Sequence, residues 1–223
     1  MSQLIQGQTE YSVHLPMNYV HLVSPDQQGE KPLVLFLHGY TDSANSLLRR
    51  ALKGSILPYN VLAPNGPFPL PVYSEKGFKE AYAWYFWEYA TDKMLIHPRV
   101  AVGMLKKLIF DLGYQKSPKV IVGFSQGGFL APYLLPEVEN VKALIAVGSA
   151  FRVQDYPEKV LHPIVAIHGG KDKVISIERA RESLLELAQK KGVTYEFHPF
   201  EHLDHTIDDE ASELLIKKIK LFL

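Results

Sequence analysis

The sequence VIVGFSQG, residues 120–127, places a Gly-x-Ser-x-Gly pentapeptide between a β-branched apolar run and an apolar helical pattern that extends to Leu135. A serine hydroxyl is a poor nucleophile unless a base reaches it, and a sharp strand-to-helix turn raises its oxygen above a sheet. The flanking glycines allow strand and helix to approach closely in that turn. A glycine-rich turn that merely contains serine would explain the pentapeptide, but not its setting. We therefore predict a nucleophile elbow at Ser125.

Further apolar runs recur on both sides of this segment. A continuous apolar run is typical of a strand covered on both faces, as in a parallel sheet packed between helices. Strands are predicted at residues 33–37, 61–63, 120–122, 143–147 and 164–167, with a weaker candidate at 195–199 and two short strands at 9–15 and 19–23. Helices are predicted at residues 43–53, 99–112, 126–135, 177–191 and 208–223.

The alternation of strands and helices restricts the architecture. Parallel strands need crossover connections, which are almost always right-handed. The sequence therefore predicts an α/β fold with a doubly wound, mostly parallel sheet flanked by helices. A chain of 223 residues with 47% hydrophobic content can bury one core, so we expect residues 1–223 to form a single domain without a separate lid domain.

Two irregular segments are predicted near the functional edge of the sheet. Residues 64–73 carry four prolines, which remove backbone donors and exclude a regular helix, so we expect a loop there. Residues 149–163 form a second long connection. Both follow the carboxyl ends of predicted strands, where open α/β sheets place their ligand crevice.

The composition excludes several classes of function. Lys+Arg and Asp+Glu both number 24, so the formal charge is zero, which argues against nucleic acid or an anionic membrane as main partner. The absence of cysteine excludes disulfides, thiolate metal sites and a cysteine nucleophile. No signal peptide or membrane span is recognisable, so we expect a cytoplasmic protein without integral membrane association. We expect neither a cofactor nor a metal, and the sequence leaves the oligomeric state open.

The acid and base of a serine mechanism are expected after the nucleophile, on loops that follow later strands. Asp172 follows the predicted strand at 164–167 and precedes a helix that Ser176 can cap. A buried aspartate at this position would hold one tautomer of an imidazole and stabilise the imidazolium that forms during attack. We therefore predict Asp172 as the acid.

Three histidines compete for the role of base. His198, His202 and His205 all follow the last predicted strand and precede the last helix, and their spacing alone does not choose among them. We favour His205, since it lies just before Asp208 and the C-terminal helix, where a loop can project it inward. The remaining histidines are interpreted as structural, surface or supporting residues: His14, His21, His38, His97, His162 and His168.

Two backbone groups are candidates for an oxyanion hole. Enzymes with a nucleophile elbow take one oxyanion-hole donor from the residue after the nucleophile and one from the loop after an early strand. The first is the N–H of Gln126. His38-Gly39-Tyr40 follows the strand at 33–37, so the second is the N–H of Tyr40.

An aromatic segment is the candidate wall of a substrate pocket. Seven of the twelve residues at 78–89 are aromatic, and both tryptophans of the chain are among them. Rings of this kind suit an apolar pocket, although each ring can equally pack a loop onto the sheet. Trp84 is our first candidate for a substrate-contacting side chain, and Phe151 is the second.

These motifs together resemble the phospholipase/carboxylesterase family of α/β-hydrolases, which includes acyl-protein thioesterases. The resemblance rests on LHG at 37–39, GFSQGG at 123–128, HG at 168–169 through Asp172, and His205, with APNG at 63–66 and AWY at 83–85 in support. It covers most of the chain and implies catalysis by Ser125, Asp172 and His205, with Tyr40 and Gln126 in the oxyanion hole.

The expected reaction is hydrolysis of a carboxylic ester or thioester through an acyl-enzyme on Ser125. The expected partner is a small-molecule ester or thioester, or an acylated macromolecule. Two alternatives remain: a ligand-binding protein that retains this shell without turnover, and a serine peptidase.

Overall fold

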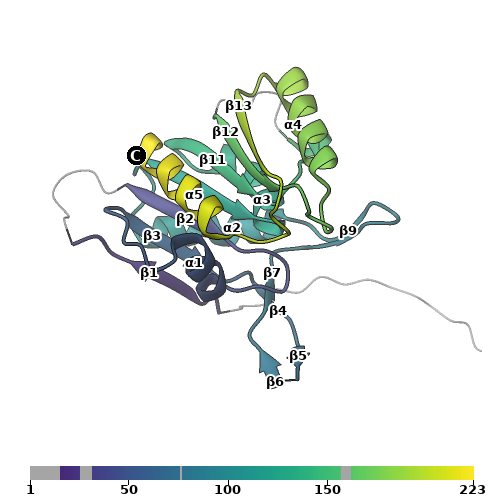
Figure 1. The fold of residues 1–223 in the computed structure, drawn as a ribbon. Coiled ribbons are helices and arrows are strands. Elements are labelled where there is room, and N and C mark those ends of the chain that lie inside the picture. The colour runs from purple at the N-terminus through teal and green to yellow at the C-terminus, as the bar shows by residue number, and fades with distance from the viewer. Residues whose placement is uncertain (1–15, 26–31, 76, 157–161) are drawn as a thin grey trace, which may run out of the picture.

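Seven strands form the central sheet of the computed structural model, which describes residues 16–25, 32–75, 77–156 and 162–223. Their order across the sheet is β1-β3-β2-β10-β11-β12-β13 (Figure 1). All neighbouring strands are parallel except β1, which is antiparallel to β3. The bounds are β1 Tyr19–Leu22, β2 Leu33–Leu37, β3 Asn60–Pro64, β10 Lys119–Phe124, β11 Val141–Val147, β12 Ile164–Gly169 and β13 Tyr195–Phe200.

Helices cover both faces of this sheet. On one face lie α1 (Ala44–Leu52) and α5 (Asp209–Phe222), which pack side by side in front of the strands in Figure 1. The other face is covered by α2 (Arg99–Asp111), α3 (Gln126–Leu134) and α4 (Ile177–Lys191). Two short 3-10 helices, η1 (Leu135–Glu137) and η2 (Val153–Asp155), complete the helical elements of the described residues. The predicted doubly wound, mostly parallel architecture is confirmed.

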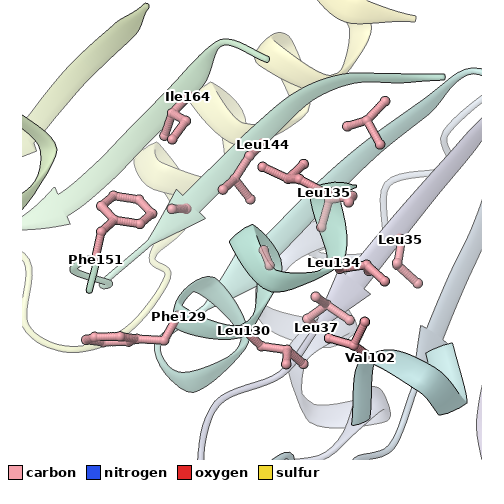
Figure 2. Packing of buried hydrophobic residues seen from close by; sticks show 14 of the residues in the cluster. Leu35, Leu37, Val102, Phe129, Leu130, Leu134, Leu135, Leu144, Phe151 and Ile164 are labelled. Atoms are coloured by element: carbon pink, nitrogen blue, oxygen red, sulfur yellow. The ribbon is translucent and has the colours of Figure 1, made fainter. Parts of the chain in front are cut away.

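Strand β2 shows why the sheet needs helices on both sides. All five of its residues are fully buried, and alternate side chains enter opposite layers. Leu35 and Leu37 join the layer of α2 and α3, where Figure 2 shows them beside Leu130 and Leu134. Full burial of one such side chain stabilises the fold by about 1.5–3 kcal/mol. The apolar run therefore contributes to two cores at once.

Local signals set the helix boundaries. The Ser43 side chain accepts a hydrogen bond from the backbone N–H of Ser46 at the start of α1. Asp208 accepts one from the N–H of Ala211 at 2.9 Å and so caps α5. Such caps satisfy N–H groups that the first turn of a helix leaves unpaired.

A buried cation closes the amino-terminal end of the central strand β10. Lys119 is 0% exposed. Its ammonium donates to the backbone carbonyls of Gln115, Ser117 and Glu139 at 2.8, 2.7 and 3.0 Å. Burial lowers the pKa of Lys119 to about 8, with Glu139 opposing the shift. The Lys119 side chain thus joins the loops at residues 115–117 and 139–140 at the amino-terminal end of β10.

The prediction of a loop at residues 64–73 was wrong in part. Three small antiparallel pairs lie between β3 and α2, and two of them begin in this segment. Prolines exclude a helix, but a two- or three-residue edge strand needs few N–H donors and tolerates them. The pairs are β4 (Phe68–Pro69) with β7 (Tyr82–Ala83), β5 (Val72–Ser74) with β6 (Gly77–Lys79), and β8 (Phe86–Glu88) with β9 (Lys93–Ile96).

The remaining strand predictions have different outcomes. The weak candidate at 195–199 is the strand β13, which pairs with β12 at the edge of the sheet. The strand predicted at 9–15 lies outside the described residues. Within the described ranges, no helix has the length and apolarity needed to cross a membrane.

Candidate active site

Ser125 lies at the junction of β10 and α3, at the carboxyl edge of the sheet. Its backbone has φ 50° and ψ −117°, a strained conformation for a residue with a side chain. The backbone N–H of Ser125 donates to the carbonyl of Val147 at 2.9 Å, and its carbonyl accepts from the hydroxyl of Ser149 at 2.7 Å. These bonds to β11 and the loop after it hold the strained turn.

The glycines on both sides of Ser125 are required by close contacts. A Cβ on Gly127 would lie 2.1 Å from the carbonyl oxygen of Leu37, and one on Gly123 would lie 2.5 Å from the Cα of Gly128. Both distances are far below a van der Waals contact. The Gly-x-Ser-x-Gly pattern therefore reflects the close approach of β10, α3 and the end of β2.

His205 approaches Ser125 from the loop between β13 and α5. Its Nε2 lies 2.9 Å from the Ser125 hydroxyl oxygen, and its Nδ1 lies 2.7 Å from Oδ2 of Asp172. An ionised carboxylate only accepts hydrogen bonds, so the proton of a neutral imidazole belongs on Nδ1. Nε2 is then free to accept from the serine hydroxyl. The imidazole also packs against the ring of Phe124, with 5.0 Å between the ring centroids.

Asp172 lies on the loop between β12 and α4, with a side chain that is 0% exposed. Its Oδ1 accepts from the backbone N–H groups of Val174 and Ile175, both at 2.9 Å. Burial alone would raise the pKa of Asp172, but the hydrogen bonds from His205, Ile175 and Val174 together hold the pKa below its usual value. The carboxylate is therefore ionised and fixed in orientation at neutral pH.

The two competing histidines have other partners. Nε2 of His202 lies 2.8 Å from Oδ2 of Asp208, at the cap of α5. Nε2 of His198 lies 2.9 Å from Oε2 of Glu196 on the same strand. Of the three candidates, the structure brings His205 alone to Ser125.

The predicted oxyanion donors flank the serine. The loop after β2 passes close to Ser125, since a Cβ on Gly39 would lie 3.2 Å from the Ser125 Cβ. The N–H groups of Tyr40 and Gln126 have no hydrogen-bond partner among the described residues. Both donors are therefore available beside the nucleophile.

His38 organises the loops behind this site. Its Nδ1 lies 2.7 Å from the Gly39 carbonyl, while Nε2 accepts from the N–H of Gly66 at 2.9 Å. This pattern requires a neutral ring, and burial lowers the pKa of His38 to about 4. The His38 carbonyl also accepts from the indole N–H of Trp84 at 2.8 Å. His38 thus has the structural role predicted for it.

The Gln126 side chain links the elbow to the aromatic segment. Its Oε1 accepts from the backbone N–H of Trp84 at 3.0 Å, and its Nε2 donates to the Tyr85 carbonyl at 2.9 Å. A primary amide satisfies both groups of that backbone at once. The position of the segment at 84–85 is therefore fixed relative to Ser125.

A cavity of about 470 Å³ extends from Ser125. This size falls within the usual range for small-molecule sites. Most of its lining side chains are aromatic or aliphatic. The lining residues are Tyr40, Tyr85, Phe86, Trp87, Glu88, Tyr89, Leu95, Ser125, Gln126 and Phe129.

The two predicted substrate-contacting side chains do not line this cavity. Trp84 is 0% exposed and packs against His38 with the rings tilted and 4.8 Å between their centroids. Phe151 is 6% exposed and belongs to the core layer that Figure 2 shows, together with Phe129. Neither predicted ring is part of the cavity lining, because both are buried in the core cluster that also contains Phe129.

The aromatic segment predicted as a pocket wall does contribute to the lining, but sequence reasoning did not single out the side chains that face the cavity. Tyr85 is adjacent to Trp84, but the irregular short strands hide which side of the segment faces the site. Phe129 had a readable signal, since it lies four residues after Ser125 and hence one helical turn along α3. Leu95, on β9, had none, because no strand was predicted there.

Two arginines fix the β8–β9 hairpin that forms the outer wall. The Arg152 guanidinium lies over the Trp87 ring, 4.7 Å from its centroid, and pairs with Asp92. The indole N–H of Trp87 also donates to Asp92 at 2.9 Å. Arg179 of α4 lies 5.0 Å from the Tyr89 ring centroid and donates to its hydroxyl at 3.0 Å. The wall is thereby attached to the loop after β11 and to α4.

The carboxylates of this site are engaged within the protein. Asp172 accepts from His205 and from two backbone N–H groups, and Glu88 accepts from the backbone N–H groups of Ala90 and Thr91. Within the described part of the chain, no group of three or more His, Asp or Glu side chains is arranged to hold a metal.

A mostly parallel sheet between two helical layers, with a strained serine turn at the end of a central strand, defines an α/β-hydrolase. The model of the phospholipase/carboxylesterase family matches residues 17–223. The chain belongs to this family, and it is accordingly a hydrolase of the ester-cleaving class.

Solved structures show the same fold at low sequence identity. The crystal structure of esterase PE8 has a TM-score of 0.72 and 22% identity, covering 93% of this chain and 99% of that one. Zea mays acyl-protein thioesterase 2 has a TM-score of 0.70 and 16% identity, with coverages of 92% and 98%. The Bacillus cereus carboxylesterase has a TM-score of 0.64 and 16% identity, with coverages of 93% and 95%. No significant match is found among curated protein sequences.

Proposed function

We propose that this protein hydrolyses carboxylic esters or thioesters through an acyl-enzyme on Ser125. The observation that carries the proposal is the continuous chain of hydrogen bonds from Ser125 Oγ through His205 to Asp172, at 2.9 and 2.7 Å. Each link has the donor and acceptor that general-base catalysis needs. Family membership supports the same class of substrate.

Acylation uses this chain in one direction. The Ser125 oxygen attacks the substrate carbonyl while its proton passes to Nε2 of His205. The imidazolium that forms lies against the ionised Asp172, which stabilises its charge. When the tetrahedral intermediate collapses, Nε2 returns the proton to the departing alcohol or thiol, and the acyl group remains on Ser125.

The carbonyl oxygen gains negative charge during attack. The N–H groups of Tyr40 and Gln126 are the proposed donors to it, and neither has another partner among the described residues. Losing one donor of this type typically costs about 3 kcal/mol in the transition state, or roughly 100-fold in rate. Deacylation repeats the sequence with water as nucleophile, and His205 as its base.

Covalent labelling tests the nucleophile. We expect a fluorophosphonate probe to label the wild-type protein on one serine, and the Ser125→Ala variant to remain unlabelled and inactive on p-nitrophenyl butyrate. Ser55→Ala is the matched control, because Ser55 is an exposed serine outside the cavity. Equal labelling of wild type and Ser125→Ala would refute the assignment.

The base is tested by a second pair of variants. His205→Ala should lose nearly all ester hydrolysis, whereas His202→Ala should retain most of it, because His202 pairs with Asp208 at a helix cap. Near-normal turnover by His205→Ala would refute the role proposed for His205.

A further inference from the structure

Tyr85 carries a polar group that the fold leaves unused. The side chain lines the cavity next to Ser125 and is only 5% exposed. Its hydroxyl has no hydrogen-bond partner among the described residues. The neighbouring Trp84 differs, because its indole N–H is satisfied within the protein by the His38 carbonyl.

An unpartnered phenol is unusual at this depth. Buried hydroxyls nearly always have a partner, because leaving them unpaired forfeits the hydrogen bonds they make in water. The Tyr85 hydroxyl oxygen is not one of the fully enclosed unpaired atoms, as Oδ1 of Asp42 is. The hydroxyl is therefore accessible, and because Tyr85 lines the cavity, a water or substrate molecule that enters there can pair with it.

The hydroxyl is held at a fixed position relative to the nucleophile. The amide of Gln126, the residue after Ser125, pairs with the backbone on both sides of the 84–85 peptide unit, at 3.0 and 2.9 Å. Burial raises the pKa of Tyr85, and the positive charge of Arg152 opposes this only in part. The phenol consequently stays protonated and remains able to donate.

The other polar side chains of the wall are engaged or lie at its mouth. The carboxylate of Glu88 accepts from the backbone N–H groups of Ala90 and Thr91 at 2.9 and 2.7 Å. The Tyr89 hydroxyl pairs with Arg179, and Tyr40 is 52% exposed. Among the described residues that line the cavity, the Tyr85 hydroxyl is thus the buried side-chain group, other than the Ser125 hydroxyl, that has no hydrogen-bond partner in the protein. Apolar pockets with few polar groups take their specificity from those groups.

We propose that the Tyr85 hydroxyl selects substrates whose cavity-bound group is apolar apart from one hydrogen-bond acceptor, such as a ketone, ether or hydroxyl oxygen. The inference rests on the proposed function and adds a specificity-determining residue to it. The group concerned is the part of the ester or thioester that extends from the carbonyl at Ser125 into the cavity. An all-hydrocarbon group leaves the hydroxyl unpaired, which is why it binds less well in the transition state.

Matched substrate pairs test this selection. We would compare p-nitrophenyl pentanoate, hexanoate and heptanoate with their 4-oxo, 5-oxo and 6-oxo counterparts, and acetate esters of hexan-1-ol and 5-oxohexan-1-ol for the alcohol side. The measured quantity is the kcat/KM ratio of each ketone to its hydrocarbon partner. In the wild type, at least one pair should show a ratio of about three to ten, the effect of one neutral hydrogen bond.

Tyr85→Phe removes only the hydroxyl and should lower that ratio to one or below. Tyr19→Phe is the matched control on the exposed edge strand β1, and it should keep the wild-type ratio. The inference is overturned if every wild-type ratio is at or below one, or if Tyr85→Phe lowers ketone and hydrocarbon turnover equally. Failure of the proposed function is a separate result, in which wild type hydrolyses no ester of the panel and the fluorophosphonate does not label Ser125.

Discussion

Replacing Asp172 by asparagine should disable the site by reversing one hydrogen bond. The two carboxylate oxygens have different partners: Oδ1 accepts from the N–H groups of Val174 and Ile175, and Oδ2 accepts from Nδ1 of His205. Asparagine has one acceptor oxygen and one donor NH2 group. Two backbone donors will hold its oxygen at the Oδ1 position, so its NH2 group will face His205. The imidazole must then carry its proton on Nε2, where it cannot act as a base toward Ser125.

The size of the effect follows from the cost of turning the amide around. The reversed orientation leaves two backbone N–H groups without acceptors, at about 1–3 kcal/mol each, or about 2–6 kcal/mol in total. The active orientation would then be populated roughly 30- to 20,000-fold less than the inactive one. We therefore expect kcat on p-nitrophenyl butyrate to fall by about two to four orders of magnitude, with little change in KM.

Comparing Asp172→Asn with Asp172→Ala distinguishes the effect of the wrong His205 tautomer from the effect of losing the negative charge. Asp172→Ala loses the orientation of His205 and leaves Val174 and Ile175 unpaired, but it does not impose the wrong tautomer. We expect Asp172→Asn to unfold at a higher urea concentration than Asp172→Ala, and yet to be no more active. The assay is steady-state hydrolysis with urea denaturation of each variant. An asparagine variant that keeps more than a tenth of wild-type kcat would refute the reasoning.

Three further predictions concern stability. The pKa of His38 is about 6.5 in the unfolded chain and about 4 in the folded chain, so the free energy of unfolding should fall as pH decreases through that interval. The expected fall from pH 7 to 5 is about 2 kcal/mol, measured by urea titration, and His38→Gln should show a smaller one. Gly127→Ala should cost about 1–3 kcal/mol because its Cβ would meet the Leu37 carbonyl. Gly103→Ala, with open space on α2, should instead stabilise by about 0.5–1 kcal/mol, and equal melting temperatures for these two variants would contradict the contacts described. Lys119→Met should lower the free energy of unfolding by about 2–4 kcal/mol, since three buried carbonyls lose their donor, and an unchanged denaturation midpoint would show that they find other partners.

The buried strands were readable from sequence because their burial on both faces leaves an unbroken apolar run. Edge strands lack this signal: Glu196 and His198 interrupt β13, which made it a weak candidate. The segment between β3 and α2 was hardest, since strands of two or three residues are set by tertiary contacts and prolines give no register.

In the candidate site, the catalytic residues could also be predicted more fully than the cavity wall. Ser125 and Asp172 were selected by their places after strands, and His205 by its place before the C-terminal helix. The structure brings the three within hydrogen-bond distance, although their catalytic roles stay a prediction. The aromatic segment at 78–89 was predicted as a wall of the cavity, but the sequence pattern did not show which rings face it, because adjacent rings such as Trp84 and Tyr85 differ only in the side to which the backbone turns them. The backbone bonds of Asp172 to Val174 and Ile175 were likewise not predicted.

The dual use of Gln126 bears on how this protein would respond to laboratory evolution. Its backbone lies beside Ser125, while its side chain carries the wall segment at 84–85. A single substitution there would disturb the turnover step and the shape of the cavity together, so few changes should survive selection. Diversity is better introduced on the β8–β9 hairpin, at Phe86 and Leu95, whose side chains reach the cavity from outside the central sheet.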